Sequence, residues 1–140
     1  LEVLCEAPPA LPPLPAAVEV AIYRIVQEAL TNVARHAQAH RCLLRLQIDQ
    51  EACHLEICDD GKGIADEHRI GVGLHAMHER ASELGGSCAI TRGESRGTTI
   101  RVTLPLGATW EAALPSAQDA APQNGVSTDV GDVSGAKLGT

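Results

Sequence analysis

Two pairs of short segments alternate apolar and polar residues, and this pattern constrains the fold more than any other feature of the chain. The first pair covers residues 41–50 and 53–59, and the second covers residues 87–91 and 98–105. Because successive side chains of a strand point to opposite faces of a sheet, each pair predicts a β-hairpin. A sheet with one apolar face needs a second layer to cover it.

Helices are expected to supply that layer. Residues 16–38 carry apolar side chains at the period of an amphipathic helix, in the stripe Val18, Ile22, Ile25, Ala29 and Val33. A second helix is expected at residues 73–86, where two glycines close it. A short strand at residues 2–6 precedes the first helix across a proline-rich connector. This order predicts an α/β fold, a two-layer α/β sandwich with a mixed sheet and both helices on one face.

Composition limits the function classes. The 140 residues suffice for one domain, and its core must be aliphatic because aromatic residues make up only 1% of the chain. A net charge of −7 argues against a nucleic-acid partner, which requires basic patches. The five cysteines include no CxxC spacing, which argues against disulfides and zinc and favours a reducing cytoplasm. No long apolar run is present, so we expect no membrane contact by this segment.

The two ends of the chain have different characters. Residues 108–140 are rich in Ala, Gly, Ser, Asp and Pro, so we expect a domain at residues 1–107 followed by a disordered tail. Trp110 is the exception, and we expect its side chain to pack against the domain and hold the start of the tail there. The chain opens in a strand and lacks an initiating Met, which indicates an excised part of a longer protein.

The first helix carries a polar ladder beside its apolar stripe. Glu28, Asn32 and His36 recur every fourth residue and therefore lie almost on one line. A carboxylate beside an amide suits Mg²⁺, which takes few protein oxygens and keeps the rest for water and phosphate. Arg35 and His36 would meet phosphate charge further along. The alternative is a helix whose polar residues merely border the core.

Three glycine-containing motifs follow, and each is weak by itself. In "DDGKG", Asp59 can accept a hydrogen bond from an amine while Gly61 and Gly63 let the backbone approach a flat ring. The alternative is an ordinary Asp-Gly turn. In "GVGLHAMHER", Gly71 and Gly73 lead into a helix whose free N–H groups suit phosphate.

The third motif, "GTTI", offers the hydroxyls of Thr98 and Thr99 at the start of the last strand. Chance agreement of all these motifs, in this order and spacing, is improbable. Over residues 1–106 the chain resembles the ATP-binding catalytic domain of sensor histidine kinases, within the superfamily that includes gyrase and MutL. The stretches "YRIVQEALTNVARHA" and "GVGLHAMHERASELGG" resemble the subfamily paired with NarL/LuxR-type response regulators.

The resemblance implies a Bergerat-type fold, bound ATP and Mg²⁺, and a role for each motif. It makes Asn32 the Mg²⁺ ligand and Glu28 the general base or the residue that orients the reaction. It makes Asp59 the acceptor for the adenine amine. The remaining nucleotide-binding positions that it implies are Arg35, His36, Gly61, Gly63, Ile64, Gly71, Gly73, Leu74, Thr98 and Thr99. The ATP lid would fall at residues 64–70 and has no aromatic residue, and His78 replaces an arginine that is common in relatives.

The resemblance also implies partners. The family transfers phosphate to a histidine on a separate dimerisation domain, and no histidine here has a convincing acceptor context, so we expect that domain to lie before residue 1. A NarL/LuxR-type response regulator and a cytoplasmic location follow from the same resemblance. Two rival functions are an anti-sigma-factor-like serine kinase, which would label a partner's serine, and a non-catalytic nucleotide-binding docking module, which nucleotide titration would reveal.

Overall fold

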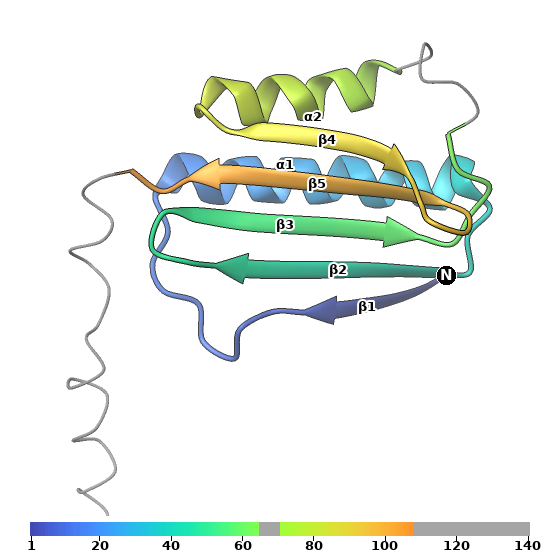
Figure 1. Ribbon diagram of the computed structural model, residues 1–140, viewed down its shortest axis with the longest axis horizontal. Coiled ribbons are helices and arrows are strands. Elements are labelled where there is room, and N and C mark those ends of the chain that lie inside the picture. Colours follow the sequence, from blue (N-terminus) through green and yellow to red (C-terminus); the bar gives the residue numbers. More distant parts are fainter. Residues whose placement is uncertain (65–70, 108–140) are drawn as a thin grey trace, which may run out of the picture.

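The protein is described here by a computed structural model that covers residues 1–64 and 71–107. Its sheet has the strand order β1-β2-β3-β5-β4 (Figure 1). The strands are β1 (Glu2–Glu6), β2 (Arg41–Ile48), β3 (Ala52–Asp59), β4 (Ser87–Arg92) and β5 (Thr98–Pro105). β1 pairs with β2 in parallel, and every other neighbouring pair is antiparallel. The mixed sheet and both hairpin pairs are thus confirmed, whereas the predictions for the lid and for the tail with Trp110 lie outside the described residues.

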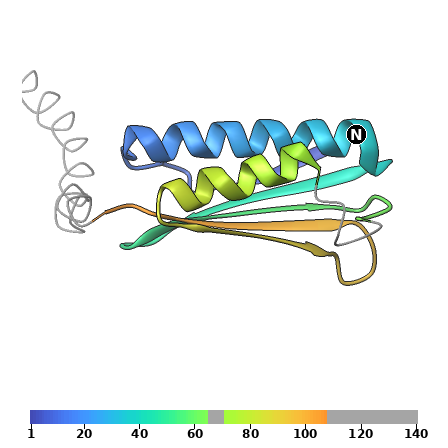
Figure 2. The same ribbon diagram turned by 90° about the horizontal axis from the view of Figure 1, so that it is seen from above.

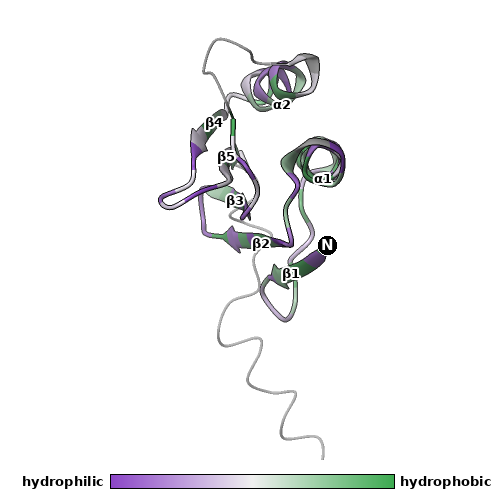
Figure 3. Ribbon diagram, turned by 90° about the vertical axis from the view of Figure 1, so that its right-hand side faces the viewer, coloured by the Kyte–Doolittle hydropathy of each residue, from purple (hydrophilic) through white to green (hydrophobic). Residues whose placement is uncertain are grey.

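Two helices form the second layer. α1 spans Ala16–Asn32 and α2 spans Val72–Glu83. Both cover the same face of the sheet, as Figure 2 shows from above and Figure 3 along the helices. The two-layer α/β sandwich is therefore confirmed.

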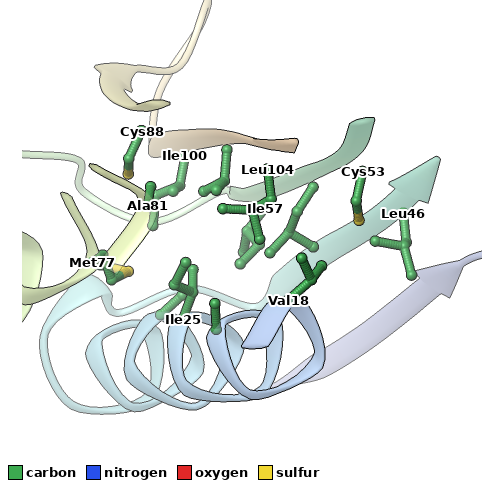
Figure 4. Packing of buried hydrophobic residues seen from close by; sticks show 14 of the residues in the cluster. Val18, Ile25, Leu46, Cys53, Ile57, Met77, Ala81, Cys88, Ile100 and Leu104 are labelled. Atoms are coloured by element: carbon green, nitrogen blue, oxygen red, sulfur yellow. The ribbon is translucent and has the colours of Figure 1, made fainter. Parts of the chain in front are cut away.

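The core lies between these layers (Figure 4). Val18, Ile25 and Ala29 of α1 are buried against the sheet, where Leu55 and Ile57 of β3 are equally buried. Three cysteines also belong to this core as free thiols, namely Cys42, Cys53 and Cys88. Burial raises the pKa of the Cys42 and Cys53 thiols to about 11, so both stay protonated at neutral pH and pack as small apolar groups.

The first helix departs from its prediction at its end. The sequence pattern predicts one α-helix to residue 38, but Val33–Ala37 form a π-helical turn and Gln38 adopts a left-handed conformation with φ of 51°. The apolar stripe still reaches the buried Val33, so hydrophobic periodicity does not reveal the change. The carbonyl of Ala37 accepts a hydrogen bond from the Lys62 N–H at 2.8 Å, which fastens this turn to the loop after β3.

The turn between β2 and β3 also differs from its prediction. Ala52 was expected in the turn but is the first residue of β3, where it pairs with Pro105. The Asp49 carboxylate accepts hydrogen bonds from the backbone N–H groups of Glu51 and Ala52, each at 2.8 Å. These bonds, that from Glu51 foremost, lower the pKa of Asp49 to about 2. An Asx-type turn therefore closes the hairpin earlier than expected.

The sheet face opposite the helices is polar. Arg45 pairs with Glu6 of β1 at 2.7 Å and with Glu56 of β3 at 3.1 Å, and Arg101 of β5 pairs with Glu56 at 2.7 Å. These pairs form a ladder of alternating charge across four strands. Such partly exposed pairs add little stability, but they keep the face hydrophilic without a covering helix.

Candidate functional site

A cavity of about 520 Å³ opens between α1, α2 and the edge of the sheet where β3 ends and β5 begins. It is lined by Glu28, Ala29, Thr31, Asn32, Val33, Arg35, Ala37, Asp59, Lys62, Gly63, Ile64, Gly71, Gly73, Leu74, Thr98 and Ile100. Its size falls in the range of small-molecule sites. Segments that are far apart in the sequence therefore meet around one cavity.

The polar ladder of α1 forms one wall of this cavity. Glu28 and Asn32 are both half-buried and both line it, and Arg35 follows in the π-helical turn. The buried stripe beside them contributes Ala29 and Val33, so the floor of the cavity is apolar. The polar residues that border the core thus face a cavity rather than bulk water. The side chain of His36, the third member of the ladder, lies outside the description.

The two carboxylates of "DDGKG" have separate roles. Asp59 ends β3 on the face that carries the core, and its carboxylate accepts a hydrogen bond from the Gly61 N–H at 2.8 Å while lining the cavity. Asp60 points elsewhere and accepts from the N–H groups of His40 at 2.8 Å and Arg41 at 2.9 Å. These bonds, that from Arg41 foremost, lower the pKa of Asp60. Of the two carboxylates, Asp59 lines the cavity and Asp60 does not.

The loop after Asp59 is fastened to its surroundings. Arg96, in the β4–β5 turn, donates from Nε to the Gly61 carbonyl at 3.2 Å. Gly97 has φ of 82° and is buried against the Asp59 carbonyl, where a Cβ would collide with that oxygen. Glycine is required there because other residues rarely adopt this φ, and because there is no room for a Cβ. The β4–β5 turn therefore holds the end of β3 in place.

The start of α2 forms the opposite wall. Gly71 precedes the helix and Gly73 lies in its first turn, and both line the cavity together with Ile64 and Leu74. A Cβ on Gly73 would overlap the Glu28 carboxylate, so that carboxylate sits directly over the first turn of α2. Small residues here let the polar ladder approach the helix start.

Two residues expected at the site do not line it. Strand alternation turns Thr98 toward the helices and the cavity, while Thr99 faces the other side of the sheet, where its hydroxyl lies 3.6 Å from the Cys58 sulfur. The expectation that both threonines line the cavity therefore does not hold in this structure. Gly61 is buried against the Ala37 carbonyl, so it shapes the loop rather than the cavity wall.

The cavity also gains residues that the sequence reasoning did not select. Lys62 is the residue between the two glycines of the motif, and Thr31 precedes Asn32 on the helix. Lys62 and Arg35 form no ion pair within residues 1–64 and 71–107, so both cationic groups are available to an anion. The position of Lys62 inside the glycine motif was the signal that could have identified it.

Other kinds of site find less support in the described part of the chain. It holds no cluster of three His, Cys, Asp or Glu side chains that would cage a metal ion. None of its helices is long and apolar enough to cross a bilayer. The cavity thus offers one amide, two carboxylates and two cations, which suits a phosphate-bearing ligand better than a metal bound by protein alone.

An α/β sandwich with a cavity of this size between its helices and one sheet edge has the features of a small-molecule-binding domain. The sequence model of the family described as "Histidine kinase-, DNA gyrase B-, and HSP90-like ATPase" matches residues 17–108. The chain belongs to this family, which implies ATP binding. The predicted resemblance to the ATP-binding domain of histidine kinases is thereby confirmed.

Known relatives agree with this assignment. Sensor histidine kinase LiaS of Bacillus subtilis is 41% identical over 91 residues, which is 64% of this chain and 25% of LiaS. The kinase/phosphatase UhpB of Salmonella typhimurium is 39% identical over 87 residues, covering 61% of this chain and 17% of UhpB. The chain thus spans about a quarter or less of these relatives.

Among solved structures, the histidine kinase domain of a blue-light activated kinase from Erythrobacter litoralis has the same fold. Its TM-score is 0.64 at 24% sequence identity, and the match covers 79% of this chain and 52% of that one.

Proposed function

We propose that this chain is the ATP-binding catalytic domain of a two-component sensor histidine kinase. It holds Mg²⁺-ATP and passes the γ-phosphate to a histidine on a separate dimerisation domain. The observation that carries the proposal is the meeting of Glu28, Asn32 and Asp59 around one cavity of about 520 Å³. Two elements supply these groups, α1 for Glu28 and Asn32 and β3 for Asp59, and family membership supplies the ligand class.

Each group has a chemical task in this proposal. Asp59 accepts a hydrogen bond from the adenine amine, while the apolar floor of Ala29 and Ile100 lies beside the ring. Arg35 and Lys62 offset phosphate charge at the cavity wall. The adenine end and the phosphate end therefore differ in polarity, which orients the nucleotide.

The donor chemistry at the ladder fits Mg²⁺. The Asn32 amide oxygen and the Glu28 carboxylate both line the cavity, one helical turn apart. Mg²⁺ takes few protein oxygens and completes its shell with water and phosphate. When bound, it would neutralise charge on the phosphates. Asn32 would hold it, and Glu28 would lie beside it.

The transfer itself needs positioning more than covalent chemistry. A nitrogen of the acceptor histidine attacks the γ-phosphorus in line, the bond to the ADP oxygen breaks, and the imidazole loses a proton. Glu28 takes up this proton or orients the attacking ring, because its carboxylate stands at the wall where α1 and α2 meet. The phosphorylated histidine then supplies a response regulator, which we propose to be of the NarL/LuxR type.

The test is titration calorimetry of the chain with ATP in the presence and absence of Mg²⁺, and with GTP. Saturable ATP binding that Mg²⁺ strengthens, with clear preference over GTP, is expected. In a second experiment, we expect label to pass from γ-labelled ATP to a separately supplied histidine domain. Acid treatment should then remove this label. The proposal would be refuted if the chain bound no nucleotide, or if it transferred an acid-stable label to a serine of a partner.

A further inference from the structure

The only tyrosine of the chain lies on the surface rather than in the core. Tyr23 is 64% exposed on α1, and Val20, one turn before it, is 55% exposed. The buried side of the same helix carries Val18, Ala21 and Ile25, so Val20 and Tyr23 face away from the sheet. A chain that is so poor in aromatic residues thus presents its tyrosine to solvent, beside a second apolar side chain.

A groove of about 100 Å³ lies beside these residues, between α1 and α2. Its lining residues are Arg24, Gln27, Glu28, Ala76, Met77 and Arg80. Within the described ranges neither Arg24 nor Arg80 takes part in an ion pair, although Arg41, Arg45 and Arg101 all do. Two guanidinium groups therefore flank one groove without a carboxylate partner among these residues.

The groove connects the exposed residues to the nucleotide cavity. Val20, Tyr23, Arg24 and Gln27 follow the spacing of one helical stripe, and Glu28 continues it. Glu28 lines both the groove and the nucleotide cavity. A segment seated along this stripe would therefore end beside the wall at which phosphate transfer is proposed.

The two arginines of the groove do not line the nucleotide cavity. Arg35 and Lys62 line that cavity, whereas Arg24 and Arg80 do not. The two unpaired arginines are thus separate from the cations that would meet ATP. Guanidinium groups match carboxylates in paired hydrogen bonds, so the complementary surface is acidic.

We propose that Val20, Tyr23, Arg24, Gln27 and Arg80, here called the outer patch, dock the protein segment that carries the acceptor histidine. That segment presents apolar side chains to Val20 and Tyr23 and carboxylates to Arg24 and Arg80. Tyrosine and arginine are the residue types on which binding energy concentrates at interfaces. This inference rests on the proposed function and adds to it the surface that delivers the acceptor.

The experiment uses the 140-residue chain as the kinase. The acceptor is the separately supplied histidine domain used to test the proposed function. Label transfer from γ-labelled ATP is measured against acceptor concentration, which separates the KM for the acceptor from kcat. The variants are the double substitution Arg24→Gln with Arg80→Gln, and Tyr23→Ala. The control is Arg41→Gln, which removes one exposed cation from the opposite face of the sheet.

The outer-patch variants should raise the KM for the acceptor about tenfold and keep the ATP dissociation constant within about twofold. Arg41→Gln should change neither constant by more than about twofold. Added salt should raise the wild-type KM and affect the double variant less. Unchanged transfer by the double variant would overturn the inference, whereas a wild type that binds ATP but labels no acceptor would overturn the proposed transfer to histidine. Loss of ATP binding by the wild type would instead overturn the proposed function.

Discussion

At the scale of single residues, Asp59 and Asp60 give the sharpest contrast, because these adjacent carboxylates face different surroundings. Asp59→Asn should reduce the preference for ATP over GTP by about tenfold, since an amide no longer repels the guanine carbonyl. Calorimetry with both nucleotides measures this preference.

Asp60→Ala is the matched control for that measurement. It removes the acceptor for the His40 and Arg41 N–H groups, so it should lower the melting temperature and leave the nucleotide preference unchanged. If wild type and Asp59→Asn prefer ATP over GTP equally, Asp59 does not contact the adenine and has only a structural role in the turn.

Asn32 is the second residue with a specific expected phenotype. Its amide oxygen is the proposed Mg²⁺ ligand, so Asn32→Ala should weaken ATP binding in Mg²⁺ more than it weakens Mg²⁺-free ADP binding. Calorimetry under both conditions measures the two losses. Glu19→Ala, at an exposed position of the same helix that does not line the cavity, serves as the control. Equal losses under both conditions would remove Asn32 from the metal site.

The site residues differ in how well the sequence could predict their positions. Glu28 and Asn32 were expected at one surface because helical spacing fixes their relative direction. Thr98 and Thr99 are adjacent in the motif, but strand alternation points them to opposite faces of the sheet, and only the strand register decides which one faces the cavity. Lys62 was not selected, because its approach to the cavity depends on a loop with no periodic pattern.

At the scale of elements, the β4–β5 turn acts as a clamp on the loop after β3. Arg96→Ala removes the hydrogen bond to the Gly61 carbonyl, so the ATP dissociation constant should rise by about two- to tenfold. Hydrogen exchange at the amides of Gly61 and Gly63 should become faster, because the loop loses one anchor.

The control for the clamp is Arg92→Ala, at the end of β4. Arg92 is exposed and makes no side-chain hydrogen bond within the described residues, so its removal should alter neither the affinity nor the exchange rates. Unaltered exchange in Arg96→Ala would show that the loop is held by the Lys62–Ala37 backbone bond alone.

The elements themselves could be predicted with few errors, and those errors have local causes. The four antiparallel strands follow from alternation, because each has one buried face. The π-helical turn at Val33–Ala37 was missed because a single wider turn leaves the apolar stripe almost unchanged. The early start of β3 was missed because it depends on hydrogen bonds to the Asp49 side chain rather than on hydrophobicity.

At the scale of the whole molecule, the arrangement of layers followed from the order of elements, since one apolar sheet face and two amphipathic helices have few ways to combine. The cavity itself did not follow from that order. Its position depends on α2 beginning opposite the end of α1, and the segment between β3 and α2 carries no regular pattern. Recognition of the motif order supplied what hydrophobic periodicity could not.

The last prediction concerns the chain acting alone. Incubated with γ-labelled ATP, it should bind the nucleotide without forming phosphohistidine in stoichiometric amounts. Three of the histidine side chains that the structure describes are engaged elsewhere: His54 with Asp49 at 2.8 Å, His75 with Glu79 at 3.0 Å and His78 near the Cys88 carbonyl at 3.2 Å. The fourth, His40, is exposed. None of these four lines the cavity, and in-line transfer requires an attacking nitrogen close to the γ-phosphorus. Supplying an acceptor domain separately should restore slow labelling, because the encounter becomes bimolecular. Stoichiometric, acid-labile label on the isolated chain would contradict this expectation, and substitution of His75 and His78 in turn would then identify the internal acceptor.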